Sequence, residues 1–298
     1  MTQTSFTLVD SQTKDLAFKI SSFADDSDFN SPRRYNYFSM FLVTKGEGTV
    51  VRDETEYAFR KSCLICFAIY QPFVIKPSDE FEGILINFHP GFFCLFKHRN
   101  EVSCNGVLFN NIYDTPVVNL DSDQVHSLLT IAGQLTTEMQ NRQLPDQEVL
   151  ISYLKIFLID ATRIKIEQRE PKETEPGKEP AIAAILKKAI EENFRTLRNP
   201  GDYAALLHVS LKVLNRASKT HFNKTLTDLI AERMIIEAKR ELYLTAKPVK
   251  QVAFDLGYID EFYFSRYFKK NVGVSPRIFR DTVGFDKLNA WNIGDSPG

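Results

Sequence analysis

The spacing of hydrophobic positions changes along this chain of 298 residues. Between residues 35 and 93, short runs rich in β-branched and aromatic residues are separated by breaks that contain Gly or Pro. The runs are YNYFSMFLVT, TVVRDETEYAF, SCLICFAIY, FVIKP and EGILINFHPGFF, and the segment KGEG after the first is typical of a turn. These features predict an antiparallel β-barrel or sandwich.

From Asp121 the hydrophobic period becomes that of an α-helix. Apolar residues recur at helical spacing over 125–135 and, after Leu144-Pro145-Asp146, over 149–161. This pattern predicts an antiparallel helical hairpin within residues 121–166. The hairpin is expected either to form a dimer surface or to cover the β-domain of its own chain, and the sequence does not favour one over the other.

The last third of the chain predicts a helix, a tight turn and a second helix. Pro248 suits the start of the first helix, and Gly257 suits its end. Asp260 is placed to cap a second helix over Glu261–Lys270, and Gly273 is suited to end it in the left-handed conformation. A glycine turn between two short helices is the geometry of a helix-turn-helix.

The second of these helices has one apolar side and one cationic side. At about 100° per residue, Phe264 and Phe268 lie on one side, while Arg266 and Lys269 lie on the other together with Phe262. An apolar back packs a helix on its domain, and a cationic front suits the major groove of DNA.

A second copy of this pattern lies upstream, in AALLHVSLKVLNRASKTHFNKTLTDLI. Arg216 matches Arg266 at an offset of 50 residues, and Asn223 takes the place of Gly273. Asn is among the non-glycine residues that best tolerate positive φ. Before the turn the offset is 49, so the downstream turn is expected to be one residue longer.

About 100 C-terminal residues resemble the DNA-binding domain of the AraC/XylS family of bacterial transcription regulators. The resemblance is carried by LLHVSLKVLNRASK, IAERMIIEAKRELYLT and VKQVAFDLGYIDEFYFSRYFKKNVGVSPRIFR. It implies two helix-turn-helix units joined by one long helix, here Leu226–Tyr243, with double-stranded DNA and RNA polymerase as partners and a homodimer as the assembly. The phrase FLVTKGEGTVV is similar to the opening hairpin of the cupin-like domain that often precedes this DNA-binding domain.

The chain is therefore predicted to be an α+β protein of two domains. Residues 1–166 are expected to form a cupin-like antiparallel β-barrel of jelly-roll type, for effector binding or dimerisation, with its helical hairpin. Residues 167–180, EQREPKETEPGKEP, are rich in Pro and charge and predict a flexible linker. Residues 181–283 are expected to form the all-α double helix-turn-helix domain, and 284–298 a polar tail.

Charge is distributed unevenly between these parts. Residues 181–283 contain 18 Lys and Arg against 11 Asp and Glu, a net charge of +7, whereas the rest of the chain carries −8 within an overall −1. A basic C-terminal part beside an acidic N-terminal part indicates that only the former meets a polyanion.

Nine residues are candidates for contact with DNA. Arg216 and Arg266 are the best candidates for guanine, and Asn215 for adenine. The lysines are expected at phosphates, Glu261 either at cytosine or at the helix dipole, and Phe262 either at a thymine methyl group or deoxyribose, or over a neighbouring helix. The full set is Lys212, Asn215, Arg216, Lys219, Glu261, Phe262, Ser265, Arg266 and Lys269. Leu211, Leu214, Phe264 and Phe268 are expected in the core.

The sequence contains no pattern typical of a catalytic site or a metal site. Cys63 and Cys66 form a CxxC within an apolar run, which favours packed reduced thiols over a redox or zinc site. His89, His98 and His126 do not have the spacing of a ligand cluster, and His89 is expected to be satisfied by the backbone. No cofactor is therefore expected, and the sequence does not locate a ligand site.

Three functional hypotheses follow. The first is a DNA-binding transcription regulator controlled by a small-molecule effector, and the second is a regulator whose N-terminal half only dimerises. The third is a metal-dependent cupin-type enzyme with an appended DNA-binding domain. The N-terminal sequence lacks the pattern of a signal peptide, and no apolar run reaches the length of a membrane span, so we expect a cytoplasmic protein without a membrane partner.

Overall fold

The computed structural model describes residues 4–10, 14–25, 28–95, 98, 102, 106–141, 145–168 and 178–283. These residues form two compact units. The first is built from Met1–Asn111 and Thr115–Glu170, and the second from Ile112–Asp114 and Pro171–Lys287, as far as these ranges are described. The expected tail 284–298, most of the expected linker 167–180, and Cys104 lie outside the described residues.

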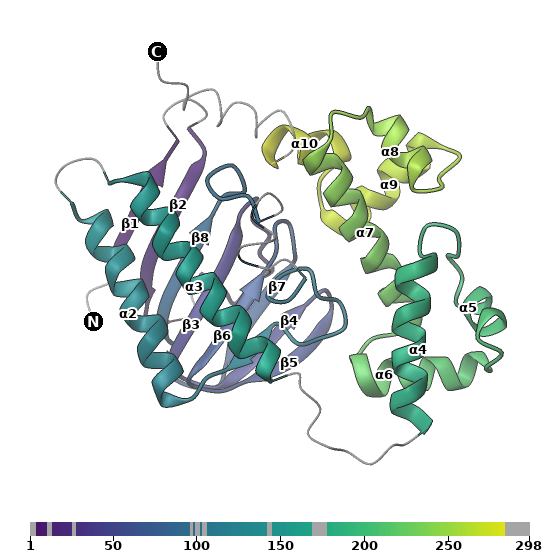
Figure 1. Ribbon diagram of the computed structural model, residues 1–298, viewed down its shortest axis with the longest axis horizontal. Helices are drawn as coiled ribbons and strands as arrows, with labels where there is room; N and C mark the ends of the chain where they lie inside the picture. Colours follow the sequence, from purple (N-terminus) through teal and green to yellow (C-terminus); the bar gives the residue numbers. More distant parts are fainter. Residues whose placement is uncertain are drawn as a thin grey trace. The chain divides into compact units, whose positions relative to one another are not determined.

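The first unit contains two antiparallel sheets (Figure 1). The larger has the order β1-β2-β8-β3-β6-β9, and the smaller the order β5-β4-β7. The strands are β1 (Ser5–Val9), β2 (Leu16–Phe23), β3 (Phe38–Lys45), β4 (Gly48–Arg52), β5 (Thr55–Phe59), β6 (Cys63–Phe67), β7 (Phe73–Pro77), β8 (Glu82–Phe88) and β9 (Val117–Asn119). The strands β1 and β2 fall in a region where the sequence predicted none.

The prediction of a closed barrel was wrong, because no strand pairing among the described residues joins the two sheets. The expected hairpin around KGEG was also wrong, since β3 and β4 flank this segment but belong to different sheets. Buried side chains from both sheets, many of them aromatic, form one core, as in a sandwich of two facing sheets. The rings of Phe67 and Phe73 stack at 4.0 Å, and those of Phe29 and Phe41 meet edge to face at 4.9 Å.

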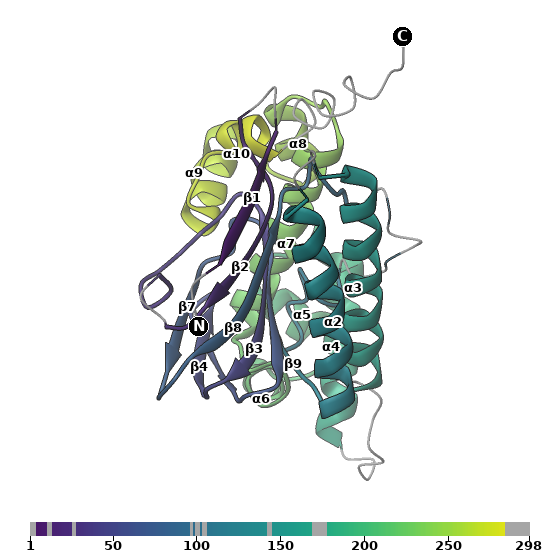
Figure 2. The same cartoon turned by 90° about the vertical axis from the view of Figure 1, so that its left-hand side faces the viewer.

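Two helices cover the outer face of the larger sheet. They are α2 (Ser122–Met139) and α3 (Gln147–Glu167), and Figure 2 shows them on the side opposite β4 and β7. The inward residues of α3, among them Leu150, Leu154 and Phe157, are fully buried. The buried Lys165 of α3 also donates to the backbone oxygens of Thr115 and Val117, each at 2.9 Å. Of the two expectations for this hairpin, covering the β-domain of its own chain is therefore supported.

The second unit is all-helical. Its helices are α4 (Lys178–Asn193), α5 (Pro200–Leu206), α6 (Leu211–Phe222), α7 (Leu226–Leu244), α8 (Val249–Asp255), α9 (Glu261–Val272) and α10 (Pro276–Val283). The pairs α5–α6 and α8–α9 are the two predicted helix-turn-helix units, and α7 joins them. None of the described helices in either unit is both long and apolar enough to cross a bilayer.

A buried carboxylate ties α7 to the segment that follows α4. Glu237 is 2% exposed and accepts hydrogen bonds from Arg195 at 2.7 Å, Arg233 at 3.1 Å and Arg240 at 3.3 Å. Burial alone would raise the pKa of Glu237, but the hydrogen bonds from Arg195 and Arg233 outweigh it and hold the pKa below its usual value. The interaction therefore stabilises the fold above the pKa of a free glutamate, about 4.3, and is lost as the pH falls through the lower folded pKa.

We expect Glu237→Gln to lower the free energy of unfolding at pH 7 by roughly 1–3 kcal/mol. The lower end of this range applies because Arg195 and Arg240 are half-exposed. Urea unfolding at pH 7 and at pH 4 measures the effect, which should shrink at the lower pH. The matched control is Glu241→Gln on the same helix, a less buried carboxylate that pairs with Lys247 at 3.0 Å. An equal loss in both variants would contradict this role for Glu237.

We expect Phe268→Ala to lower the free energy of unfolding by about 3–5 kcal/mol, because it empties a fully buried position. Its ring lies 6.0 Å from that of Phe264 on the same helix and 5.6 Å from that of Phe279, so α9 and α10 both lose contacts. Phe262→Ala on the exposed side of the same helix is the control and should change stability by less than about 0.5 kcal/mol. Similar losses in the two variants, measured by urea unfolding, would contradict this assignment of the two faces.

Candidate nucleic-acid interface and ligand cavity

The two helix-turn-helix units match in the lengths and spacing of their helices. The helices α5 and α8 are offset by 49 residues and α6 and α9 by 50, so the second turn is one residue longer, as predicted. The turns contain His208 with φ +52° and Gly257 with φ +78°, at the same offset of 49. Asn223 and Gly273 end the second helices in the left-handed conformation with φ of 55° and 90°.

Local hydrogen bonds set where each second helix begins. The Ser210 side chain accepts from the Val213 backbone N–H at 3.4 Å, and the Asp260 side chain accepts from the Phe262 N–H at 2.8 Å. Thr225 caps α7 in the same way. These caps satisfy backbone donors that would otherwise lack partners at a helix start.

The turn of the second unit is held by Arg198. Its guanidinium lies 3.8 Å from the centre of the Tyr258 ring and donates to the backbone oxygen of Leu256 at 2.8 Å. A Cβ atom at Gly257 would come within 2.7 Å of the Arg195 carbonyl oxygen, so the close approach of these segments requires glycine. Sequence reasoning did not find Arg198, because its partners are about 60 residues away.

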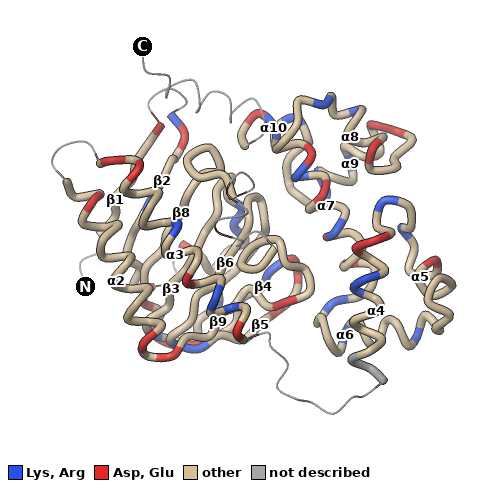
Figure 3. The backbone as a smooth tube through the Cα atoms, viewed as in Figure 1, with Lys and Arg blue, Asp and Glu red and all other residues tan. Residues whose placement is uncertain are grey.

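The cationic residues lie on the exposed sides of α6 and α9. Lys212, Arg216 and Lys219 are exposed on α6, and Arg266 and Lys269 are exposed on α9. Figure 3 shows that Lys and Arg recur along α4, α6 and α9. The candidates nearer the body of the domain, Asn215, Glu261 and Ser265, are partly buried.

The apolar sides pack inward with one exception. Leu214, Phe264 and Phe268 are fully buried, as expected, whereas Leu211 is 42% exposed and was wrongly assigned to the core. Leu211 is the first residue of α6, where the helix has not yet turned onto the domain. Phe262 is 73% exposed, so it does not cover a neighbouring helix of this unit.

Sequence reasoning missed a cavity of about 280 Å³ in the first unit. In the strand register, Ser5 lies opposite Ser21, Ser21 opposite Leu85, and Lys19 opposite Asn87, so one face of β1, β2 and β8 supplies these side chains. Lys19 and Ser21 are polar although they lie on the same strand face as the buried Phe23, and this was the signal in the sequence that could have indicated the cavity. The complete lining is Ser5, Lys19, Ser21, Ser22, Phe23, Asp25, Asp28, Phe29, Arg33, Tyr35, Tyr37, Leu85 and Asn87.

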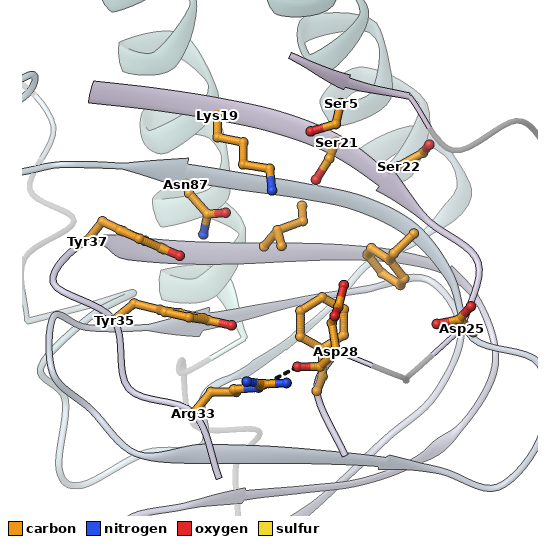
Figure 4. Close-up of a pocket in the computed structure, with 13 residues that line it drawn as sticks. Ser5, Lys19, Ser21, Ser22, Asp25, Asp28, Arg33, Tyr35, Tyr37 and Asn87 are labelled. Atoms are coloured by element: carbon orange, nitrogen blue, oxygen red, sulfur yellow. Dashed lines mark hydrogen bonds between the residues drawn. The ribbon is translucent and has the colours of Figure 1, made fainter. Parts of the chain in front are cut away.

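Charged and aromatic side chains meet in this cavity (Figure 4). The rings of Tyr35 and Tyr37 stack with centres 4.7 Å apart, and burial raises the pKa of both, so both phenols stay protonated. Arg33 donates from Nε to the backbone oxygen of Asp28 at 2.6 Å, and Figure 4 shows Lys19 across the cavity from this pair. Cations, hydroxyl groups and an aromatic wall therefore converge on one space.

The CxxC pair cannot act as one site. Cys63 and Cys66 are three residues apart on β6, so their side chains point to opposite faces of the sheet. Both are buried thiols, and burial raises the pKa of Cys63 to about 12. They are packed reduced thiols, as the sequence favoured. The buried His89 accepts from the Gly91 backbone N–H at 3.0 Å, and the described residues hold no cluster of three or more metal-binding side chains.

Comparison with known proteins agrees with this geometry. Residues 203–282 match the family model described as a helix-turn-helix domain. Over 67 residues the chain is 36% identical to the regulatory protein SoxS of Escherichia coli, covering 22% of this chain and 63% of SoxS. Residues 203–282 therefore contain a helix-turn-helix domain similar to those of transcription regulators. The relatives named here are transcription regulators.

Other proteins align over longer stretches of the chain. The raffinose operon transcriptional regulatory protein RafR of Pediococcus pentosaceus is 26% identical over 164 residues, which is 55% of each chain. The chain thus spans about half of RafR and less than two thirds of SoxS. ToxT of Vibrio cholerae, one of whose structures contains an unsaturated fatty acid, aligns over 94% of this chain at 15% identity with a TM-score of 0.37.

Proposed function

We propose that this protein is a DNA-binding transcription regulator whose two helix-turn-helix units enter successive major grooves. The observation that carries the proposal is the repeat itself: α6 and α9 have matching caps, matching left-handed ends and exposed cations at matching positions. At 1.5 Å per residue, the 19 residues of α7 span roughly 28 Å, comparable to the 34 Å between grooves on one DNA face.

In this proposal the candidate residues differ in the part of the DNA that they contact. Arg216 and Arg266 contact guanine, because a guanidinium can bridge O6 and N7. Lys212, Lys219 and Lys269 contact phosphates and supply affinity without sequence information. Asn215, Glu261 and Ser265, which are partly buried, lie beside these contacts and adjust them. Homodimerisation and contact with RNA polymerase, which the family implies, stay predictions.

The DNA-binding proposal is tested by fluorescence anisotropy of the full chain on selected and unrelated DNA at several salt concentrations. We expect Arg266→Ala to lose about 1–3 kcal/mol on the preferred sequence and little on other sequences. Lys269→Ala should weaken binding to all sequences about equally and lower the salt slope by about one. The control is Lys188→Ala, an exposed lysine on α4, and equal behaviour of all three variants would contradict the division of roles.

We further propose that the cavity of the first unit binds a small polar effector. Its lining carries Lys19 and Arg33 together with Asp25 and Asp28, besides serine hydroxyl groups and the tyrosine pair. This chemistry suits a compact molecule that has a carboxylate or phosphate and several hydroxyl or amino groups. A long acyl chain needs a continuous apolar lining, which these residues do not supply.

The effector proposal is tested by thermal unfolding of the full chain with amino acids, monosaccharide phosphates and oleate. A small polar compound should raise the Tm, since a ligand that binds only the folded state stabilises it. Lys19→Met should abolish that shift, and the control Lys76→Met, on the exposed side of β7, should keep it. A rise in Tm with oleate alone, or no rise with any of the compounds, would contradict the proposed ligand class.

A further inference from the structure

Exposed apolar side chains gather around the start of α9. Phe262 is 73% exposed and Tyr263 55%, and Ile259 in the preceding turn is 96% exposed. Single exposed apolar residues are ordinary, but a group of three at one helix start marks a surface that meets a partner.

Phe262 belongs to the cationic side of α9. It precedes Arg266 by four residues and Lys269 by seven, which places the three on one side of a helix. The opposite side, formed by Phe264 and Phe268, is fully buried, so the outward direction of Phe262 is fixed by packing.

The backbone around Phe262 is also fixed. Its N–H donates to the Asp260 carboxylate at 2.8 Å, which places it in the first turn of the helix. N-terminal residues of a recognition helix are those that contact base edges. Tyr263, by contrast, has its ring 6.0 Å from that of Tyr258 and so packs partly on its own domain.

The edges of base pairs in the major groove offer a phenyl ring one apolar partner, the C5-methyl group of thymine. We propose that Phe262 is a specificity-determining residue that packs on a thymine methyl group in the half-site of the second helix-turn-helix. This inference rests on the proposed DNA-binding function and names one base at one half-site.

The matching position of the first unit makes the two half-sites different. Lys212 stands where Phe262 would be at the offset of 50, and it is exposed on α6. A lysine there contacts phosphate or guanine and gains nothing from a thymine methyl group. The thymine contact therefore tells the two half-sites apart and orients the domain on its DNA.

The test replaces thymine by deoxyuridine, which lacks only the methyl group, one position at a time in the preferred DNA of the full chain. Anisotropy titrations at constant salt should show about fourfold weaker binding at one thymine of the second half-site, the factor expected for one buried methyl group. Phe262→Ala should bind both DNAs equally. Phe254→Ala, which removes the same side chain from α8, should keep the fourfold difference.

The outcomes separate this inference from the proposed function. The role of Phe262 would be overturned if the chain binds DNA specifically but loses no affinity when thymine is replaced by deoxyuridine. It would also be overturned if the affinity loss persists in Phe262→Ala. Neither result would contradict the proposed function as a regulator. Failure of the wild-type chain to prefer any DNA sequence would overturn both. Because Phe262 is largely exposed, the alanine variant is expected to fold, and urea unfolding confirms this before the titrations.

Discussion

Burial of one side of each recognition helix determines what its other side can do. Turning α9 so that Arg266 points inward would expose Phe264 and Phe268, and each buried phenyl ring contributes roughly 1.5–3 kcal/mol. An exposed ion pair contributes only about 0–1 kcal/mol. Hydrophobic packing, and not charge, therefore sets the direction in which the cations of the second unit point, and Leu214 and Ala217 play the same part in the first.

The features that sequence reasoning predicted well are those encoded locally. Caps, left-handed helix ends and hydrophobic spacing depend on residues a few positions apart, so Asp260, Gly273 and Asn223 could be assigned from the chain alone. The face of Phe268 follows from the same spacing. Leu211 was assigned wrongly because helical spacing gives the side of the helix on which a residue lies but not where the domain surface ends.

Features that depend on distant residues could not be predicted. Whether strands close a barrel depends on which edges meet, and the aromatic filling between the sheets has no local signature. The cavity combines Lys19, Arg33 and Asn87, which come together only through the pairing of β2 with β8 and the path of the segment before β3. Arg198 was missed for the same reason.

The two units are suited to different chemistry. The first places polar and charged side chains around a pocket, as a small ligand requires, and the second places cations on exposed helix sides, as a polyanion requires. Within the second unit the duplicated helices are alike in backbone and share an arginine and a lysine at matching positions, but α6 has Lys212 where α9 has Phe262. Duplication thus gives both units a common geometry. A residue difference between them lets the two half-sites differ, which fixes the orientation of the domain on its DNA.

The central claim is that one chain presents two recognition helices to one face of DNA. Hydroxyl-radical footprinting of the full chain on its preferred sequence measures this directly. We predict two protected stretches on the same face of the duplex with centres about 10 base pairs apart. A single protected stretch, or two stretches on opposite faces, would contradict it.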